Sequence, residues 1–133
     1  MSTVRNITVF LADDSMVLRE RVLDMLRDIP GVEVLGCAAD GLHAIYCIRN
    51  LRPDAVILDS QMPRGTGLDV LKNIRPVTGT PLMSVFTNFS YPQYRKRALE
   101  GGADYFFDKT TEFEKLRELF GQLTGALEPQ TTH

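Results

Sequence analysis

The stretch AVILD at residues 55–59 decides the fold prediction, because four apolar residues in a row end directly at an acidic one. It is the most strand-like run in the chain, and Pro53 separates it from the segment before it. Short apolar runs bounded by such breakers are typical of buried strands. The stretch therefore predicts a strand that ends at Asp59.

The same pattern continues in both directions from this strand. Short apolar runs alternate with longer segments in which apolar residues recur at helical spacing. We expect strands over residues 7–12, 32–37, 55–58, 81–86 and 103–107, and helices over residues 15–29, 41–52, 68–74, 92–100 and 111–127. Five strands each followed by a helix predict an α/β fold, a parallel sheet with helices on both faces, because right-handed crossovers permit little else.

The helices carry more detailed predictions. Asp14 or Ser15 is a candidate cap for the first helix, and Asp40-Gly41 opens the second. The segment Thr111-Glu-Phe-Glu114 has the form of a capping box, so the last helix is expected to start there. Four residues of the second helix are expected to share one face: Leu42, Ile45, Ile48 and Leu51.

Length and composition bound the class of protein. The chain has 133 residues, 44% of them hydrophobic and 24% charged, which predicts one globular domain over residues 1–133 and excludes disorder. We expect its core over about residues 6–127 and a frayed tail at residues 128–133. Fifteen basic and 17 acidic residues give a net charge of -2, which argues against direct nucleic-acid binding.

Cysteine and histidine usage exclude two kinds of site. Cys37 and Cys47 cannot form a disulfide framework, so a reduced, cytoplasmic setting is the simplest interpretation. His43 and His133 supply no zinc-ligand spacing. The apolar run at residues 7–12 is too short for a secretory signal, and no stretch approaches the ~20 apolar residues of a membrane insertion segment.

The polar residues matter for where they fall. Asp13 and Asp14 follow the first strand, Asp59 the third, Thr87 the fourth and Lys109 the fifth. The carboxyl ends of parallel strands meet at one rim of an open sheet, where ligands bind at the topological switch point. Taken singly, each residue has a simpler interpretation as a cap, a loop residue or a strand residue. Their joint placement favours a functional site.

The chemistry of this group is that of phosphoryl transfer. Three carboxylates at one rim repel one another unless a cation joins them, and oxygen ligands suit Mg²⁺. A carboxylate can also attack phosphorus to give an aspartyl phosphate. A lysine ammonium and a threonine hydroxyl can then contact the phosphoryl oxygens, and such positioning and charge neutralisation are most of what the reaction needs.

Four motifs together resemble the receiver domain of bacterial two-component response regulators. They are Leu11-Ala-Asp-Asp14, Val56-Ile-Leu-Asp-Ser-Gln-Met-Pro63 with Gly67, Phe86-Thr87, and Gly102-Ala-Asp-Tyr-Phe-Phe-Asp-Lys109. The resemblance covers the chain from about Asn6 to Leu127. It implies a five-stranded flavodoxin-like fold with strand order 2-1-3-4-5.

The resemblance also implies a role for each residue. Asp59 would accept the phosphoryl group from a phosphohistidine on a sensor histidine kinase or a histidine phosphotransfer protein. Asp14 and Asp59 would bind Mg²⁺ directly, helped by the backbone carbonyl of Gln61, while Asp13 would act mostly through water. The phosphoryl group would contact Thr87 and Lys109.

The implied output is a changed protein surface. Thr87 would move toward the phosphoryl group, Phe106 would fill the vacated space, and the surface of strand 4, helix 4, strand 5 and helix 5 would change and signal to a protein target. The domain would catalyse only its own phosphorylation and dephosphorylation.

The sequence departs from the family pattern at several positions. Thr110 replaces the usual proline after Lys109, Asn88 replaces a small residue after Thr87, and Phe106 replaces a frequent tyrosine. Gln61 and the bulky Phe89 occupy the positions that tune dephosphorylation. We predict that Phe89 hinders the attacking water and lengthens the life of the aspartyl phosphate.

Other functions are weighed against this one. An interaction module of the same fold that works without phosphorylation is the main alternative, favoured only by Asn88 and Thr110. A Mg²⁺-dependent phosphatase with an aspartyl nucleophile ranks lower, because Asp13 and Asp14 are adjacent rather than two residues apart. A flavin-binding protein ranks lowest, because no hydroxyl- and glycine-rich loop follows Ala12. The sequence is consistent with a complete regulator or with a piece of a longer one.

Overall fold

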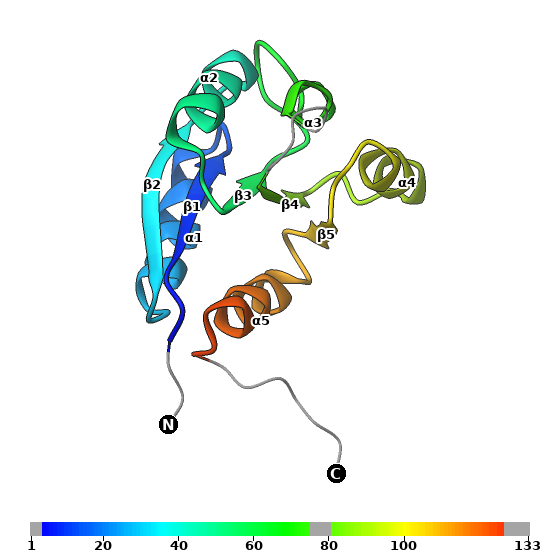
Figure 1. Ribbon diagram of the computed structural model, residues 1–133. Coiled ribbons are helices and arrows are strands. Elements are labelled where there is room, and N and C mark those ends of the chain that lie inside the picture. The colour runs from blue at the N-terminus through cyan, green and yellow to red at the C-terminus, as the bar shows by residue number, and fades with distance from the viewer. Residues whose placement is uncertain (1–3, 75–80, 127–133) are drawn as a thin grey trace.

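The computed structural model describes residues 4–74 and 81–126, and within them five strands alternate with five helices (Figure 1). The strands are β1 (Ile7–Ala12), β2 (Val32–Ala38), β3 (Ala55–Leu58), β4 (Leu82–Thr87) and β5 (Tyr105–Asp108). The helices are α1 (Met16–Arg27), α2 (Gly41–Leu51), α3 (Gly67–Ile74), α4 (Pro92–Glu100) and α5 (Phe113–Thr124). The expected tail at residues 128–133 lies outside the described residues, as does Leu127.

The sheet has the predicted parallel topology, with the strand order β2-β1-β3-β4-β5. Ala12 at the end of β1 is in register with Leu58 at the end of β3, and Leu58 is in register with Val85 of β4. The chain leaves β1 toward β2 on one side and returns past it to β3 on the other. The carboxyl ends of β1 and β3 therefore form the topological switch point.

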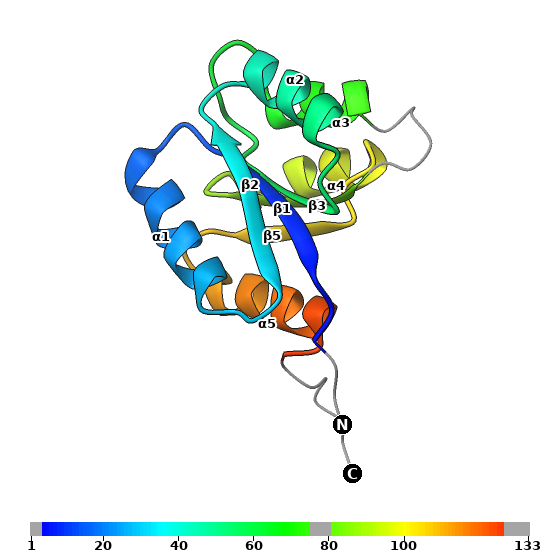
Figure 2. The same cartoon turned by 60° about the vertical axis from the view of Figure 1, so that its left-hand side comes forward.

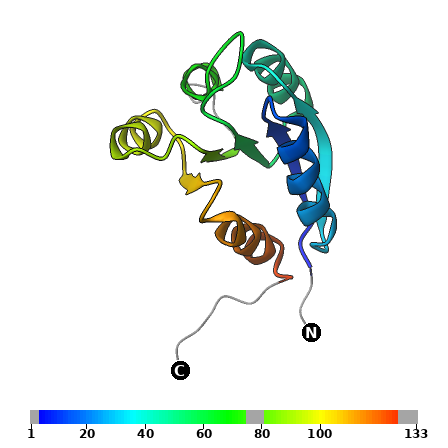
Figure 3. The same cartoon turned by 180° about the vertical axis from the view of Figure 1, so that it is seen from behind.

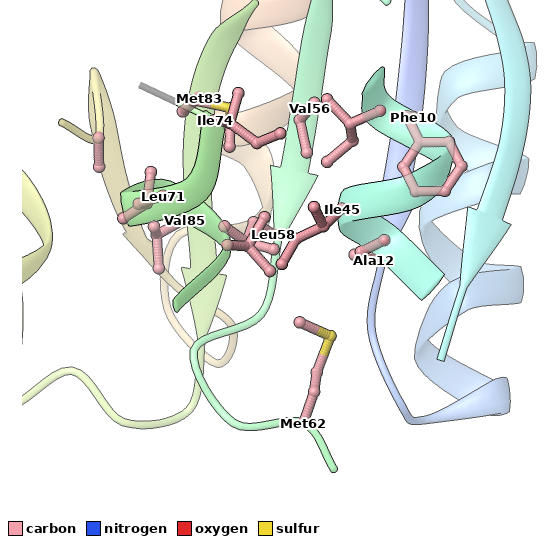
Figure 4. Packing of buried hydrophobic residues seen from close by; sticks show 14 of the residues in the cluster. Phe10, Ala12, Ile45, Val56, Leu58, Met62, Leu71, Ile74, Met83 and Val85 are labelled. Atoms are coloured by element: carbon pink, nitrogen blue, oxygen red, sulfur yellow. The ribbon is translucent and has the colours of Figure 1, made fainter. Parts of the chain in front are cut away.

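Helices cover both faces of the sheet. α1 and α5 lie on one face, and α2, α3 and α4 lie on the other (Figures 2 and 3). Side chains alternate along β1, so Val9 and Leu11 pack toward α1 and α5, while Phe10 and Ala12 pack toward the opposite layer. Figure 4 shows the hydrophobic cluster between the sheet and the layer of α2, α3 and α4. It includes the following residues: Phe10, Ile45, Val56, Leu58, Leu71, Ile74, Met83 and Val85.

Side-chain caps start the first two helices, as the sequence predicts. Ser15, rather than Asp14, caps α1, and its hydroxyl oxygen accepts the backbone N–H of Leu18 at 3.3 Å. Asp40 caps α2, and its carboxylate accepts the backbone N–H of His43 at 2.8 Å. Each cap satisfies a backbone donor that the helix itself leaves unpaired.

The predicted capping box of α5 is wrong. The cap residue is Glu112, one position later than expected, and no side chain closes the helix start there. The backbone N–H of Thr111 donates instead to Asp108 at 3.2 Å, and Glu112 accepts the N–H of Asp108 at 2.9 Å. These residues are therefore used to turn the chain after β5, so the helix starts at Phe113.

The predicted stripe on α2 is buried only in part. Ile45 and Ile48 are buried, but Leu42 and Leu51 are 60% and 44% exposed. The helix contacts the sheet through a narrow face that also includes Ala44, so residues at both ends of the stripe remain in solvent. In the described part of the chain, no helix is both long and apolar enough to cross a membrane.

A close backbone contact fixes the loop after β3 against α2. A Cβ atom on Gly41 would lie 2.2 Å from the carbonyl oxygen of Gly65, so this approach requires glycine. The backbone N–H groups of Gly41 and Leu42 donate to carbonyl oxygens of that loop at 3.1 and 3.0 Å. The side chain of Arg64 adds an ion pair with Asp40 at 2.6 Å. The loop that carries Gln61 is thereby held next to the ends of β1 and β3.

Candidate functional site

Three carboxylates meet at the carboxyl ends of β1 and β3. One oxygen each of Asp13, Asp14 and Asp59 lies within 4.8 Å of the others. The backbone N–H of Asp59 donates to the carbonyl of Ala12 at 2.9 Å, which continues the β1–β3 pairing beyond the last strand residues. Asp13 and Asp59 are buried, whereas Asp14 is exposed. The structure thus gathers the acidic residues that the sequence placed at this rim.

Lys109 joins this acidic group from the end of β5. Its Nζ atom lies 2.7 Å from Oδ2 of Asp13 and 3.1 Å from Oδ2 of Asp59. Only 7% of the Lys109 side chain is exposed, so its simpler interpretation as a solvated loop lysine is wrong. A buried ammonium group needs such partners, because unpaired charges are costly to bury. One cation and three carboxylates leave the cluster with an excess of negative charge.

Burial and charge perturb Asp59. Removal from water raises the pKa of Asp59 above its usual value, and the nearby charge of Asp13 raises it further. The Lys109 ammonium and the backbone N–H of Gln61, 3.3 Å from Oδ1, lower the pKa of Asp59 but do not cancel the increase. The carboxylate is therefore poorly solvated and in need of positive charge.

Thr87 is also brought to this region, but its hydroxyl bonds elsewhere. The side chain is fully buried at the end of β4. Its Oγ1 atom lies 2.6 Å from Oγ of Ser60 and accepts the backbone N–H of Phe89 at 3.1 Å. Among the described residues, the side-chain partners of Asp59 do not include Thr87. Thr87 ends β4 at the same rim of the sheet as the acidic group, but its hydroxyl is bonded to Ser60.

This arrangement suits a hard cation and a carboxylate nucleophile. Clustered carboxylate oxygens are the ligands that Mg²⁺ prefers, and two of the three here are removed from bulk water. Lys109 supplies a fixed positive charge within reach of Asp59.

Comparison with known proteins places the chain in a family. The family model for the response regulator receiver domain matches residues 9–120. The chain belongs to the response regulator receiver domain family. The family resemblance and the strand order that it implies are confirmed.

Curated relatives include enzymes that carry a receiver domain in a longer chain. The chain is 38% identical over 119 residues to a protein-glutamate methylesterase/protein-glutamine glutaminase of Methanospirillum hungatei, covering 88% of this chain and 35% of that one. A protein of the same description from Pyrococcus abyssi is 38% identical over 109 residues, covering 80% of this chain and 29% of that one. The receiver domain described here therefore spans about a third of the length of these relatives.

Solved structures have the same fold. The response regulator domain of CheB from Thermotoga maritima superposes with a TM-score of 0.80 at 27% identity, covering 94% of this chain and all of that chain. A LuxR-family response regulator from Staphylococcus aureus gives a TM-score of 0.81 at 29% identity, covering 89% of this chain and 98% of that chain. These similarities support the receiver fold across nearly the whole described chain.

Phe106, the residue expected to act as the switch aromatic, is buried in this structure. From the sequence, Phe106 is expected to enter the space that Thr87 vacates, yet its side chain is only 4% exposed here. The guanidinium of Arg95 lies 5.6 Å from the centre of the Phe106 ring. The ring also lines a cavity of about 230 Å³ between α3, α4 and the sheet. Burial of this ring is therefore not a step that phosphorylation has to produce.

Thr110, which stands where proline is expected, forms hydrogen bonds in the loop after Lys109. The Lys109–Thr110 peptide bond is trans. The backbone N–H of Thr110, which proline lacks, donates to Oδ1 of Asp108 at 2.7 Å, and the Thr110 hydroxyl bonds to the same oxygen. The hydroxyl of Ser90 bonds to the other oxygen of Asp108. These bonds hold the pKa of Asp108 well below its usual range.

Three residues of this site were missed at the sequence level, namely Ser60, Ser90 and Asp108. Ser60 pairs with a residue 27 positions away, and Ser90 pairs with one 18 positions away. No local pattern reveals such pairs. The sequence offered one indication of a role in the site, because Ser60 directly follows Asp59 and Asp108 directly precedes Lys109.

Proposed function

We propose that this receiver domain accepts a phosphoryl group from a phosphohistidine donor onto Asp59 in a Mg²⁺-dependent reaction. The observation that carries the proposal is the buried Asp59 carboxylate, 3.1 Å from the Lys109 ammonium and grouped with Asp13 and Asp14. A sensor histidine kinase or a histidine phosphotransfer protein would be the donor. The receiver would then signal to a downstream protein target.

The acidic group fits a divalent cation. Asp14 and Asp59 would hold Mg²⁺ directly with the backbone carbonyl of Gln61, and Asp13 would hold it mostly through water. The excess negative charge beside Lys109 supports this assignment, because in the described residues Lys109 is the one cation paired with these carboxylates, while Arg19 donates only to the backbone carbonyl of Asp13. When bound, Mg²⁺ would neutralise charge on the carboxylates and on the phosphoryl oxygens. The Mn²⁺-bound form of the response regulator Rcp1 and a CheX–CheY–Mg²⁺ complex from Borrelia burgdorferi agree with this choice of ion.

Asp59 would act as the nucleophile. An oxygen of its carboxylate attacks phosphorus and forms the O–P bond, while the N–P bond to the donor imidazole breaks and its electron pair stays on that nitrogen. Lys109 would shift from the carboxylates to the new phosphoryl oxygens, and the Thr87 hydroxyl would donate to another of them. The positions of both side chains at strand ends, which are fixed by the sheet, support these roles.

The output surface would be formed by α4, β5 and α5. Tyr91, Leu99 and Tyr105 on this side are 57%, 41% and 40% exposed, which suits a contact surface for a protein. Arg95 of α4 interacts with both β5 and the start of α5. Its guanidinium lies over the Phe106 ring, and its charge helps to lower the pKa of Glu112, the cap residue of α5. A change at Thr87 would therefore be transmitted through β4 to this surface.

The proposal assigns no other reaction to the domain. It would catalyse only its own phosphorylation and dephosphorylation, and the methylesterase activity named for its relatives is not transferred to it. Neither nucleic-acid binding nor membrane insertion is proposed, in line with the net charge of -2. We place its action in the cytoplasm, where free thiols such as those of Cys37 and Cys47 stay reduced.

The test is uptake of a phosphoryl group from acetyl phosphate, followed by intact mass. Wild type with Mg²⁺ is expected to gain one phosphoryl group, whereas wild type with EDTA and Asp59→Asn with Mg²⁺ are expected to gain none. Equal labelling of Asp59→Asn would contradict the proposal. No labelling of wild type would favour an interaction module that works without phosphorylation.

A further inference from the structure

Two buried hydroxyl groups bond to each other beside the proposed acceptor. Oγ of Ser60 lies 2.6 Å from Oγ1 of Thr87, and the two residues are 8% and 0% exposed. Ser60 directly follows Asp59, and Thr87 is the last residue of β4. Phosphoryl transfer as proposed above uses the Thr87 hydroxyl but gives Ser60 no part.

The Thr87 hydroxyl is bonded to Ser60 rather than to a carboxylate of the acidic group. Side chains alternate along β4, so Thr87 shares a face with Val85, which packs toward α3 and α4. Ser60 lines the cavity on that face together with Val85 and Phe106. The Asp59 carboxylate, in contrast, bonds to Lys109. The Thr87 hydroxyl is therefore bonded to a residue that lines the cavity, and not to the acidic group.

The hydrogen bonds of the Thr87 hydroxyl show which contact must break before it can bind a phosphoryl group. Oγ1 of Thr87 already accepts the N–H of Phe89 and shares one bond with Ser60. Either hydroxyl can donate in the Ser60–Thr87 bond, but in both cases Oγ1 of Thr87 is held 2.6 Å from Ser60, and moving this oxygen to a phosphoryl group on Asp59 breaks the bond. The cavity of about 230 Å³ beside Ser60 has room for a water molecule that would satisfy the released serine. The bond can thus be broken without leaving a buried hydroxyl unpaired.

We infer that Ser60 is a positioning residue that holds Thr87 in the resting orientation and so restrains phosphorylation. This inference rests on the proposed function, because it concerns the turn of Thr87 toward the phosphoryl group. Ser60 stabilises only the resting form, so its hydroxyl sets how readily the domain enters the phosphorylated form. A neutral hydrogen bond of this kind corresponds to about a three- to tenfold change in an equilibrium.

Three variants test the role of the Ser60 hydroxyl. Ser60→Ala removes it, Ser60→Thr keeps it, and Ser84→Ala is a matched control, because Ser84 is also buried and its hydroxyl lacks a partner among the described residues. The readouts are the rate of labelling by acetyl phosphate with saturating Mg²⁺ and the affinity for beryllofluoride, which mimics a phosphoryl group on aspartate.

We expect Ser60→Ala to be labelled about three- to tenfold faster than wild type and to bind beryllofluoride more tightly by a similar factor. Ser60→Thr and Ser84→Ala should resemble wild type. A Ser60→Ala variant that is labelled at the wild-type rate or more slowly would overturn the inference. So would a Ser60→Thr variant that is as fast as Ser60→Ala, because the hydroxyl would then have no effect of its own.

A second measurement separates this inference from the proposed function. Urea unfolding without Mg²⁺ or phosphodonor is compared for wild type, Ser60→Ala, Thr87→Val and the double variant. We expect the two substitutions to be non-additive, because they remove the same bond. Additive effects would show that the bond is absent and would overturn the inference. Non-additive effects with no labelling of wild type would overturn the proposed function, and with it the regulatory role of Ser60.

Discussion

The ammonium group of Lys109 lies 3.1 Å from Oδ2 of Asp59, although the two residues are 50 positions apart in the chain. The same ammonium also contacts Asp13, and in the described residues no second cation is paired with these carboxylates, because Arg19 donates only to the backbone carbonyl of Asp13. The site therefore holds more negative than positive charge in a buried position. We expect this imbalance to favour binding of a cation and to lower the stability of the fold without one.

The imbalance predicts that Asp59→Asn stabilises the fold when Mg²⁺ is absent. Burial and the charge of Asp13 raise the pKa of Asp59 in the folded state. A carboxyl group with a raised folded pKa binds protons more tightly in the folded state, so stability falls as pH rises through the interval between the unfolded and folded values. At pH 7 the ionised group therefore destabilises the fold.

Thermal unfolding at pH 7 in EDTA measures this effect. We expect the Asp59→Asn midpoint to rise by about 3–6 °C, which corresponds to about 1 kcal/mol for a domain of this size. Lys109 keeps Asp13 as a partner in the variant, so its charge is not left unpaired. Asp14→Asn, at an exposed position, should change the midpoint less. A lower midpoint for Asp59→Asn would contradict this account.

Mg²⁺ should reverse the cost of the acidic group. Binding to the folded state alone stabilises it by about 1.4 kcal/mol when the free ion is at ten times its dissociation constant. We expect Mg²⁺ to raise the wild-type unfolding midpoint and to have a much smaller effect on Asp14→Asn, which lacks a proposed ligand. Sodium chloride at matched ionic strength is the control. Equal shifts for the two proteins would remove Asp14 from the site.

We expect the contribution of Asp40 to the stability of the fold to be lost in acid. Its hydrogen bonds to Arg64 and to the backbone of His43 hold its pKa below the usual range. A group with a lowered folded pKa contributes stability that is present above its unfolded pKa and is lost as pH falls through the folded value. Asp40→Asn keeps a capping side chain but removes this charge.

Urea unfolding between pH 7 and pH 3 tests the role of Asp40. We expect Asp40→Asn to be less stable than wild type at pH 7 and the difference to shrink as the pH falls below about 4. Asp24→Asn is the matched control, because its ion pair with Arg27 is exposed on both sides and contributes little. A difference between wild type and Asp40→Asn that stays constant with pH would be evidence against the ion pair.

We expect proline, the residue expected at this position from the family pattern, to destabilise the fold when it replaces Thr110. Thr110→Pro removes the N–H that donates to Asp108 at 2.7 Å and also removes the hydroxyl, whereas Thr110→Ala removes only the hydroxyl. We expect Thr110→Pro to lower the free energy of unfolding by about 1–2 kcal/mol and Thr110→Ala to lower it less. Chemical denaturation of both variants checks this. Wild-type stability of Thr110→Pro would show that the loop does not depend on this donor.

The order and type of all ten elements could be predicted because their signals are local. Apolar runs such as residues 55–58 and the cap at Asp40 are read within a few residues. The ends are less well defined, and β5 begins at Tyr105 rather than at residue 103. The start of α5 was misplaced because Asp108 competes for the N–H of Thr111, and a capping motif does not show such competition.

The site could be predicted only as far as strand ends determine it. Parallel strands bring Asp13, Asp59 and Lys109 to one rim, so their proximity follows from topology. The burial of Lys109 and the bond between Ser60 and Thr87 depend on side-chain packing between separate loops.

The central claim is that Asp59 itself receives the phosphoryl group, and the most direct test is to locate the modified residue. Wild-type protein is labelled with acetyl phosphate and Mg²⁺ and then reduced with borohydride, which converts an aspartyl phosphate to homoserine. Tandem mass spectrometry of the peptides then identifies the position. We predict homoserine at residue 59 and at no other aspartate. Homoserine at residue 13 or 14, or a stable phosphoryl group on His43, would contradict the account.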